Sequence, residues 1–484
     1  MPIPVRLASP KPLPGVCSGL ETEPRRLGTP NPLPSAGQRT SLAHHRFLVI
    51  SGLMQASDRI SISPLTGAPD ASVTVPGSKS YTNRALLAAA LACGRSTLSG
   101  ALFSDDTHYM AQALNTLGIS VHEDPKNCRF AVDGADGAVP DTEVELFVGN
   151  AGTAARFLTA MLALGPGRYR LDGVARMRER PMAHLIEALR GLGSTIDEHG
   201  SPGCFPITVS GRGRQPGEVR VQLPGNASSQ FISGLLLAAP CAGSTVEIDV
   251  AGELVSKPYL DMTIDVMEAF GVGVECPQEY RRFRVASGQR YRGCDYAVEP
   301  DASAASYFFA AAAITGGRVR VEGLGTQSRQ GDLGLVDILA KMGAQVEKQA
   351  SSTTVTGTGE LRGVEVDMKN LSDVAQTLAV VAPFASSPTR VTGIGFIRKK
   401  ETDRVGAVVR ELQRLGVRAS EEADGYVIHP GPVHGGVVET YDDHRLAMSF
   451  ALLGLRVPGI TILDPACTSK TFPRYFEVLE TLRA

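Results

Sequence analysis

The sequence lacks any apolar run long enough to cross a membrane, which needs about 20 consecutive residues. Its longest such run, around 232–241, is interrupted by Gly234 and Pro240. It also lacks an excess of charge, because 48 Lys and Arg residues face 50 Asp and Glu residues, a net charge of −2. This balance gives no indication of nucleic acid or a membrane surface as a partner. If the ligands are anionic, the basic residues that bind them must be concentrated locally.

The eight cysteines lack both the C-x-x-C pairs and the spacings that are typical of metal sites. In a chain of 484 residues, such scattered cysteines indicate reduced, mostly buried thiols. We therefore expect a cytoplasmic protein.

Residues 1–57 lack the periodicity of a folded segment. Nine prolines fall in the first 34 positions, and up to Arg46 six Lys and Arg residues face two Glu residues. Such a composition cannot bury enough apolar surface to order itself. We interpret the segment as a disordered or mis-assigned N-terminal extension, with Met54 as the alternative start. A targeting segment is the other reading, but prolines oppose the amphipathic helix of a transit peptide.

What the chain does contain is a distinctive helix start. Pro76-Gly77 predicts a turn, Ser78 or Ser80 an N-cap, and the alanine- and leucine-rich run that follows a buried helix. Lys79, Ser80 and Arg84 then cluster at a helix N-terminus, where free backbone N–H groups and the helix dipole favour an anion.

The same construction recurs at intervals of 71 to 76 residues. A cap-rich tetrad precedes a helix of small residues at Asn150–Thr153, Asn226–Ser229, Asp301–Ala304, Ser372–Ala375 and Asp442–Arg445. Strand-like runs follow most of these helices, and a second helix then ends on a glycine such as Gly118 or Gly193, which suits a left-handed C-cap. We predict six copies of one α/β unit of about 70–75 residues. A strand pair in 60–75 leads into the first unit.

The repeat argues for two domains of three units each. Since no stretch within 60–484 looks like a long linker, we expect short, hinge-like strands to join them.

Further charged residues gather near these helix starts, at Arg176–Pro181, Lys399–Arg404, Asp442–Arg445 and Ser469–Thr471. Arginine binds phosphate or carboxylate with two hydrogen bonds, whereas lysine is a compact charge that can also transfer a proton. Each cluster alone is typical of a solvated surface. Their recurrence at equivalent positions of a repeat predicts a site for a polyanionic small molecule between two domains.

These stretches resemble the 5-enolpyruvylshikimate-3-phosphate synthase family over about residues 58–484, in the family's order. The matching motifs are Pro76–Ser80, Asn83-Arg84, Asn150–Thr153 with Arg156, Arg176–Pro181, Ser228–Phe231, Ser256–Tyr259, Lys400–Arg404, Asp443–Arg445 and Asp464–Pro473.

The resemblance implies two inverse α/β-barrel-like domains, each of three repeated βαβαββ units, joined by a short double-stranded hinge. Domain I would combine 58–76 with 301–484, domain II would be 77–300, and the active site would lie in the cleft between them. It also implies a monomer that binds phosphoenolpyruvate and shikimate 3-phosphate with no metal and no organic cofactor.

The resemblance also assigns site residues. Shikimate 3-phosphate would be held by Lys79, Ser80, Arg84, Ser228, Ser229, Gln230, Ser256, Tyr259, Asp373 and Lys400. Phosphoenolpyruvate would be held by Lys79, Asn150, Gly152, Thr153, Arg180, Gln230, Arg404, Arg445 and Lys470.

The implied reaction is an addition–elimination of the shikimate pathway, which leads to chorismate and the aromatic amino acids. The 5-hydroxyl of shikimate 3-phosphate attacks phosphoenolpyruvate, and the tetrahedral ketal then loses phosphate. Asp373 and Glu401 are the acid/base candidates, with Lys79, Lys470 and His444 as assisting groups. Glu401 lies next to cations that favour its ionisation, so burial would have to offset them for it to act as an acid.

Two positions depart from the family pattern, and one bears on inhibition. Phe396 stands where many members carry Asn, which removes one polar contact to the shikimate moiety, and Phe157 stands where Pro is common. Gly152 matches the form in which glyphosate occupies the phosphoenolpyruvate site, because an absent side chain leaves room. We predict inhibition by glyphosate.

Three alternatives share some of these features. UDP-N-acetylglucosamine enolpyruvyl transferase shares the repeat but uses Lys-Asn where this chain has Lys79-Ser80, and it carries a reactive cysteine that 170–181 lacks. RNA 3′-phosphate cyclase has related units but needs a nucleophilic histidine and a nucleotide loop. A non-catalytic anion-binding scaffold would have no need of Asp373, Glu401 and His444 beside the cations.

Overall fold

The protein is described by a computed structural model over residues 58–276 and 280–483. The prediction for the N-terminal extension, residues 1–57, lies outside these described residues. In the described ranges, no helix has both the length and the apolar character that a membrane span requires.

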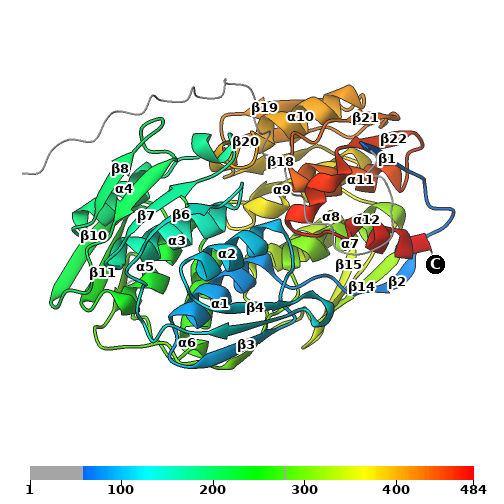
Figure 1. Ribbon diagram of the computed structural model, residues 1–484. Coiled ribbons are helices and arrows are strands. Elements are labelled where there is room, and N and C mark those ends of the chain that lie inside the picture. The colour runs from blue at the N-terminus through cyan, green and yellow to red at the C-terminus, as the bar shows by residue number, and fades with distance from the viewer. Residues whose placement is uncertain (1–57, 277–279, 484) are drawn as a thin grey trace, which may run out of the picture. The chain divides into compact units, whose positions relative to one another are not determined.

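The described chain alternates helices and strands, as predicted for an α/β protein (Figure 1). The α-helices are α1 Lys79–Leu91, α2 Asp105–Thr116, α3 Gly152–Leu164, α4 Ala183–Gly191, α5 Ser229–Ala238, α6 Pro258–Ala269, α7 Ala302–Thr315, α8 Leu335–Met342, α9 Ala375–Val381, α10 Arg404–Arg414, α11 His444–Gly454 and α12 Tyr475–Glu480. The strands are β1 Arg59–Ile62, β2 Asp70–Val73, β3 Arg95–Ser99, β4 Val121–Asp124, β5 Arg129–Asp133, β6 Glu143–Phe147, β7 Arg168–Asp172, β8 Thr195–Glu198, β9 Ile207–Ser210, β10 Glu218–Pro224, β11 Thr245–Ala251, β12 Arg282–Val285, β13 Asp295–Ala297, β14 Arg318–Glu322, β15 Gln345–Lys348, β16 Ser352–Thr356, β17 Glu365–Asp367, β18 Thr389–Thr392, β19 Ala419–Glu422, β20 Gly425–Ile428, β21 Gly436–Val438 and β22 Ile460–Leu463.

Within the described ranges these strands form six small mixed sheets. Four sheets have four strands, in the orders β13-β3-β5-β4, β6-β7-β9-β8, β2-β14-β16-β15 and β17-β18-β20-β19. Two have three strands, β10-β11-β12 and β21-β22-β1. Each sheet begins with one parallel pair, and its remaining pairs are antiparallel.

The strand pair predicted in 60–75 is wrong in its pairing. β1 pairs with β22 and β2 pairs with β14, so the two strands belong to different sheets. Alternation of apolar and polar residues predicts which face of a strand is buried, but it does not identify the neighbouring strand.

Four of the six predicted helix starts have a side-chain cap. The Ser78 hydroxyl accepts a hydrogen bond from the Tyr81 backbone N at 3.5 Å, so Ser78 rather than Ser80 caps α1. Ser228, Asp301 and Asp443 cap α5, α7 and α11 in the same way. Two starts differ. The N-cap of α3 is Ala151, which has no side-chain hydrogen bond, and a 3₁₀ turn, η5 (Ser372–Val374), precedes α9.

The helices that follow these starts are buried almost throughout, because they are built from small and aliphatic residues. All thirteen residues of α3 are buried, and α3 packs against α5 (Figure 1). Close packing needs small residues: a Cβ on Gly234 of α5 would lie 3.2 Å from the Arg156 carbonyl oxygen. The second helices end as predicted, since Gly118 and Gly271 have φ of 87° and 84°.

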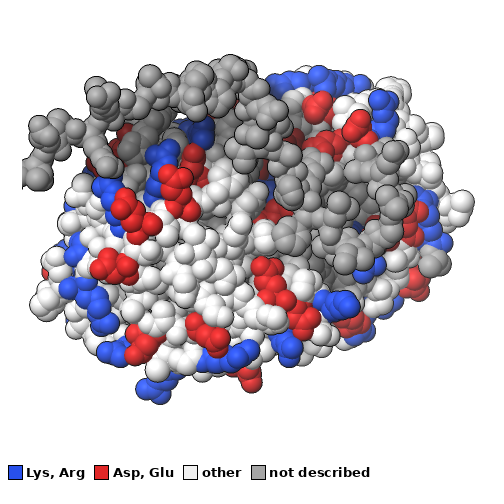
Figure 2. Space-filling view, in the orientation of Figure 1, with Lys and Arg blue, Asp and Glu red and all other residues white. Residues whose placement is uncertain are grey.

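Two separate clusters of buried apolar side chains hold these elements together. One runs from Tyr81 to Val298 and includes α1, α3 and α5. The other combines residues of 62–75 with residues of 302–482 and includes α7, α9 and α11. On the surface, Figure 2 shows basic and acidic side chains interspersed over the visible face, in keeping with the small net charge.

Candidate active site

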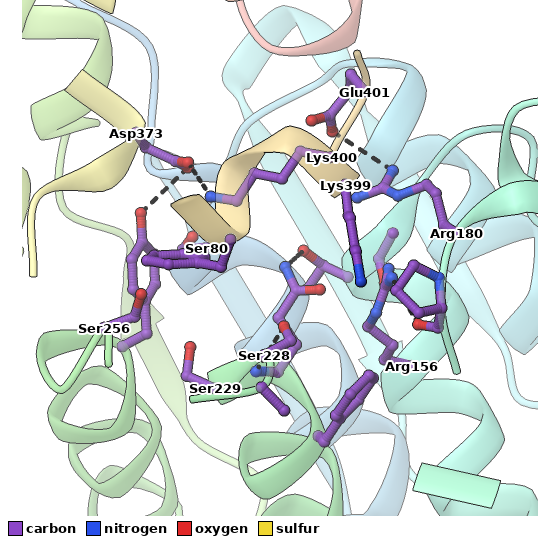
Figure 3. Close-up of a pocket in the computed structure, with 18 of the residues that line it drawn as sticks. Ser80, Arg156, Arg180, Ser228, Ser229, Ser256, Asp373, Lys399, Lys400 and Glu401 are labelled. Carbon is purple, nitrogen blue, oxygen red and sulfur yellow. Dashed lines mark hydrogen bonds and ion pairs between the residues drawn. The ribbon is translucent and has the colours of Figure 1, made fainter. Parts of the chain in front are cut away.

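A cavity of about 460 Å³ lies where residues from both apolar clusters meet. The first turns of α1, α3 and α5 contribute one part of its wall, and the segment around η5, η7 (Gly395–Lys399) and the start of α10 contributes another (Figure 3). Helix N-termini present unpaired N–H groups, which favour an anion in the space that they face.

Most of the predicted site residues line this cavity. They are Lys79, Ser80, Gly152, Thr153, Arg180, Ser228, Ser229, Gln230, Ser256, Tyr259, Asp373, Lys400, Glu401 and Arg404. The other predicted site residues do not line it: Arg84, Asn150, His444, Arg445 and Lys470. Six lining residues are Lys or Arg and three are Asp or Glu, so the cavity is locally basic in a protein of nearly balanced charge.

Asp373 lies at one end of the cavity, with the Lys400 ammonium group beside it (Figure 3). Its carboxylate accepts hydrogen bonds from Lys400 Nζ, from Arg445 Nη2 at 2.7 Å and from Arg404 Nη1 at 3.3 Å. Burial disfavours the charged form, but Arg445, Lys400 and Arg404 outweigh it and hold the pKa of Asp373 well below its usual range. Asp373 is therefore an ionised carboxylate that can accept a proton.

Glu401 lies against a second group of cations. Glu401 Oε2 is 2.8 Å from Arg404 Nη2, and Oε1 is 3.5 Å from Arg180 Nη1. The side chain is only 7% exposed, yet Arg404 and Arg180 outweigh burial and hold its pKa well below the usual range. The sequence could not show whether burial or the nearby cations dominate the pKa of Glu401. In the structure the cations dominate. Without substrates, Glu401 is ionised.

Two lysines that the sequence assigned to the site share a carboxylate that it missed. Asp106 lies 3.6 Å from Lys79 Nζ and 3.0 Å from Lys470 Nζ, and its side chain is only 4% exposed. Lys470 Nζ also donates to the Asn150 carbonyl oxygen at 2.7 Å. In the sequence, Asp106 is one acidic residue in an ordinary first turn, and no local signal distinguishes it.

Arg180 lies directly against the start of α3. Its Nη1 donates to the carbonyl oxygen and the side-chain oxygen of Asn150, both at 3.1 Å. A Cβ on Gly152 would come within 2.5 Å of Arg180 Nη2 and of Arg156 Nη1. The absence of a side chain at Gly152 therefore allows both guanidinium groups to reach this helix start.

Arg84 supports the wall from behind. Its guanidinium donates to Thr263 Oγ1 at 2.8 Å, to the Ser80 carbonyl oxygen at 2.9 Å and to the Tyr259 carbonyl oxygen at 3.0 Å. It also lies 5.3 Å from the centre of the Phe157 ring. The unusual Phe157 thus packs on a buried cation. Burial lowers the pKa of Arg84 to about 10, which leaves it charged at neutral pH.

His444 is completely buried behind the cavity wall. Neither ring nitrogen has a hydrogen-bond partner within the described part of the chain. Burial, with help from Arg445 and Lys79, holds its pKa well below the usual range. The imidazole is therefore neutral. Its neighbour Arg445 lines a small adjoining cavity together with Lys79 and Ser80.

Phe396 and Lys399 also line the cavity, although neither is among the predicted substrate-binding residues. Lys400 Nζ lies 5.7 Å from the centre of the Phe396 ring, a cation–π distance. The position that departs from the family pattern therefore contacts the ammonium group that pairs with Asp373. Lys399 reaches the cavity from the other side of the same turn (Figure 3).

Comparison with known proteins agrees with the motifs. Residues 65–479 match the EPSP synthase (3-phosphoshikimate 1-carboxyvinyltransferase) family. The 3-phosphoshikimate 1-carboxyvinyltransferase of Nostoc sp. is 51% identical over 87% of this chain and 98% of its own length. A chloroplastic enzyme of that name from Nicotiana tabacum is 45% identical over 88% of this chain and 85% of its own.

A solved structure supports the same assignment. The EPSP synthase of Acinetobacter baumannii has a TM-score of 0.74 to this chain and is 29% identical, with coverage of 88% of this chain and 98% of that one. The sequence-based predictions of family and activity are thereby confirmed. The chain belongs to the EPSP synthase family, the 3-phosphoshikimate 1-carboxyvinyltransferases of the shikimate pathway.

Proposed function

We propose that this chain transfers the enolpyruvyl group of phosphoenolpyruvate to the 5-hydroxyl of shikimate 3-phosphate and releases phosphate. The observation that carries this proposal is the pairing of two carboxylates, Asp373 and Glu401, with an excess of cations around one cavity. Both substrates are polyanions, so the cations bind them, and the carboxylates supply the proton transfers that addition and elimination require.

Shikimate 3-phosphate would occupy the end of the cavity near Asp373. Ser228, Ser229 and Ser256 present hydroxyl groups to the cavity, and Lys400 pairs with Asp373 above them in the view of Figure 3. Hydroxyl groups and an ammonium group suit a phosphate ester, and a carboxylate suits a ring hydroxyl. Asp373, ionised and close to this end, is the base that we assign to the 5-hydroxyl.

Phosphoenolpyruvate would bind beside Glu401, where Arg180 and Arg404 converge with Lys79. The binding of this anion gives the two guanidinium groups a new counter-ion. Their hold on Glu401 then weakens, and burial raises the pKa of Glu401 towards the range of a general acid. We assign Glu401 to the protonation of the methylene carbon, with Lys79 and Lys470 as assisting groups.

His444 would act on this site without touching substrate. Its ring is completely buried and neutral, so it carries no charge that acts on Glu401. The imidazole thus supports the site by packing.

We further propose that the chain forms two inverse α/β domains of three repeated units, 58–76 with 301–484 and 77–300. The described residues pack as one compact unit, and support for two domains comes from the two apolar clusters inside it, whose residues divide at these limits. Where the chain crosses, the Ser78 N donates to the Glu299 carbonyl oxygen at 2.8 Å and the Asp301 N to the Pro76 carbonyl oxygen at 2.8 Å. Such a two-stranded connection suits a hinge.

The proposed enzyme is a cytoplasmic monomer that needs no cofactor. Support for a reducing compartment comes from the seven cysteines of the described ranges, all of which are free thiols.

The test is phosphate release from phosphoenolpyruvate with two acceptors in separate reactions. Release with shikimate 3-phosphate and none with UDP-N-acetylglucosamine is the expected result. Release with the UDP-sugar alone would place the chain with the related transferases. Absence of release with either acceptor would favour the anion-binding scaffold.

A further inference from the structure

Behind the cavity wall, Asp332 shares the hydroxyl of Tyr259 with Asp373. Tyr259 Oη lies 3.3 Å from Asp332 Oδ2 and 3.2 Å from Asp373 Oδ2. A phenol has one proton and donates one of these hydrogen bonds at a time. In the other contact, either a carboxyl proton is donated to the tyrosine oxygen or two acceptors face each other unfavourably.

The two carboxyl groups have very different surroundings. Asp373 contacts three cationic side chains directly, as described above. Asp332 is only 5% exposed, and its Oδ2 also accepts a hydrogen bond from Ser303 Oγ. Its Oδ1 has no hydrogen-bond partner within the described ranges. The nearest cation, Arg445, reaches Asp332 through Ser303, whose Oγ lies 3.4 Å from Arg445 Nη2.

These surroundings determine where an added proton is held. Burial and the Asp373 carboxylate raise the pKa of Asp332 to about 6, with Asp301 adding to the rise and Arg445 and the Ser303 hydroxyl opposing it. Tyr259, from α6, keeps its own proton, because burial and the two carboxylates Asp332 and Asp373 raise its pKa well above the usual range. A proton that reaches this group is therefore held better on Asp332 than on Asp373.

We propose that Asp332 is a positioning residue that takes over, through the hydroxyl of Tyr259, the proton that Asp373 removes from the substrate. This inference rests on the proposed function, in which Asp373 is the base. In the step, Asp373 gives its proton to Tyr259 Oη while the tyrosine's own proton passes to Asp332 Oδ2. One O–H bond breaks and one forms at the tyrosine, which stays neutral, and Asp373 returns to its ionised form.

The position of Asp332 fits this indirect role. Asp373 and Tyr259 line the cavity, whereas Asp332 lies behind them on the 3₁₀ turn η4 (Gly331–Gly334). The preceding Gln330 fixes this turn, because its side chain accepts from the Ala302 N at 3.1 Å and donates to the Pro300 carbonyl oxygen at 2.7 Å. Asp332 is therefore placed to exchange a proton with Asp373 through the hydroxyl of Tyr259.

The test is Asp332→Asn, an isosteric change that leaves a group unable to take up a proton. We expect kcat to fall about 10- to 100-fold, while the calorimetric Kd for shikimate 3-phosphate stays within about threefold of the wild-type value. The pH profile should change as well. Wild-type activity should fall as the pH drops through about 6, because protonated Asp332 cannot accept a proton, and this limb should be absent in D332N. Asp337→Asn, on the exposed surface of α8, is the matched control and should behave as wild type.

A wild-type kcat in D332N, or persistence of its limb near pH 6, would overturn the proposal. If D332N does not bind shikimate 3-phosphate, Asp332→Glu decides, because a restored carboxyl should restore the limb at a shifted pH and an unshifted limb would contradict the relay. If the wild type releases no phosphate at all, the proposed function fails instead. Thermal unfolding then still tests the proton on Asp332. The wild type should lose stability as the pH rises and Asp332 ionises, whereas the amide of D332N does not titrate, so the Tm of D332N minus that of wild type should increase between pH 5 and 8. A constant difference would refute the assignment.

Discussion

The substitution Gly152→Ala should weaken the binding of phosphoenolpyruvate with little effect on the other substrate. The new methyl group would lie 2.5 Å from Arg180 Nη2, whereas ordinary contacts need about 3.5 Å, so the guanidinium must move by about 1 Å. Arg180 is only 5% exposed and its two hydrogen bonds to Asn150 fix its position. Because the guanidinium group is fixed, its movement weakens these charge-assisted hydrogen bonds.

One such hydrogen bond contributes about 1.5–3 kcal/mol, so KM for phosphoenolpyruvate should rise roughly 10- to 100-fold. The KM for shikimate 3-phosphate should change little, because the hydroxyl groups assigned to it come from α5 and the loop before α6. Glyphosate inhibition should weaken in parallel, since the methyl group takes up space at the same place.

The assay is the initial rate of phosphate release with each substrate varied in turn. The matched control is Gly191→Ala in α4, where a Cβ would meet no atom within 4 Å. That variant should keep both KM values. A wild-type KM for phosphoenolpyruvate in G152A would refute the reasoning, because Arg180 would then be free to move or unimportant for binding.

Four further predictions follow from the same geometry. Glyphosate should raise the apparent KM for phosphoenolpyruvate of the wild type without lowering kcat, and inhibition independent of phosphoenolpyruvate would contradict this. Arg84→Met should lower the free energy of unfolding in urea by about 2–4 kcal/mol, because several buried polar partners lose their donor, and an unchanged midpoint would refute it. Arg176→Ala should raise both KM values several-fold, since Arg176 Nη2 donates to the Lys400 carbonyl oxygen at 2.8 Å and so helps to position Lys400 and Glu401; wild-type kinetics would count against this role. Asp373 and Glu401 have lowered pKa values, so the stability that they contribute should be present above pH about 4 and lost as the pH falls through their folded-state pKa values, at about 1.4 kcal/mol for each unit of lowering. Acid titration of unfolding should show a smaller loss for Glu401→Gln than for wild type.

Much of the fold could be predicted because its signals are local. An N-cap such as Ser78 or Asp443 satisfies backbone groups only two or three residues away, so the short sequence pattern carries the helix start. The same holds for the glycines after the second helices. The partners of β1 and β2 could not be predicted, because each pairs with a strand hundreds of residues away and alternation does not specify a neighbour.

The site shows the same division. Lys79, Arg180 and Glu401 belong to motifs and could be predicted for the site, whereas Asp106 and Asp332 could not. The two acids acquire their partners only through folding, Asp106 from Lys470 and Asp332 from Tyr259. The ionisation of Glu401 likewise depends on the balance of burial against nearby cations, which only distances can decide.

The central claim, that this cavity carries out the transfer, is tested most directly by Glu401→Gln. The variant keeps the shape of the side chain but cannot ionise, so shikimate 3-phosphate should still bind, as calorimetry would measure. Phosphate release from phosphoenolpyruvate in the same preparation should fall by about 100-fold or more. Binding retained with turnover lost is the result that we predict. Turnover at the wild-type rate would show that Glu401 takes no part in the proton transfers and would contradict the account.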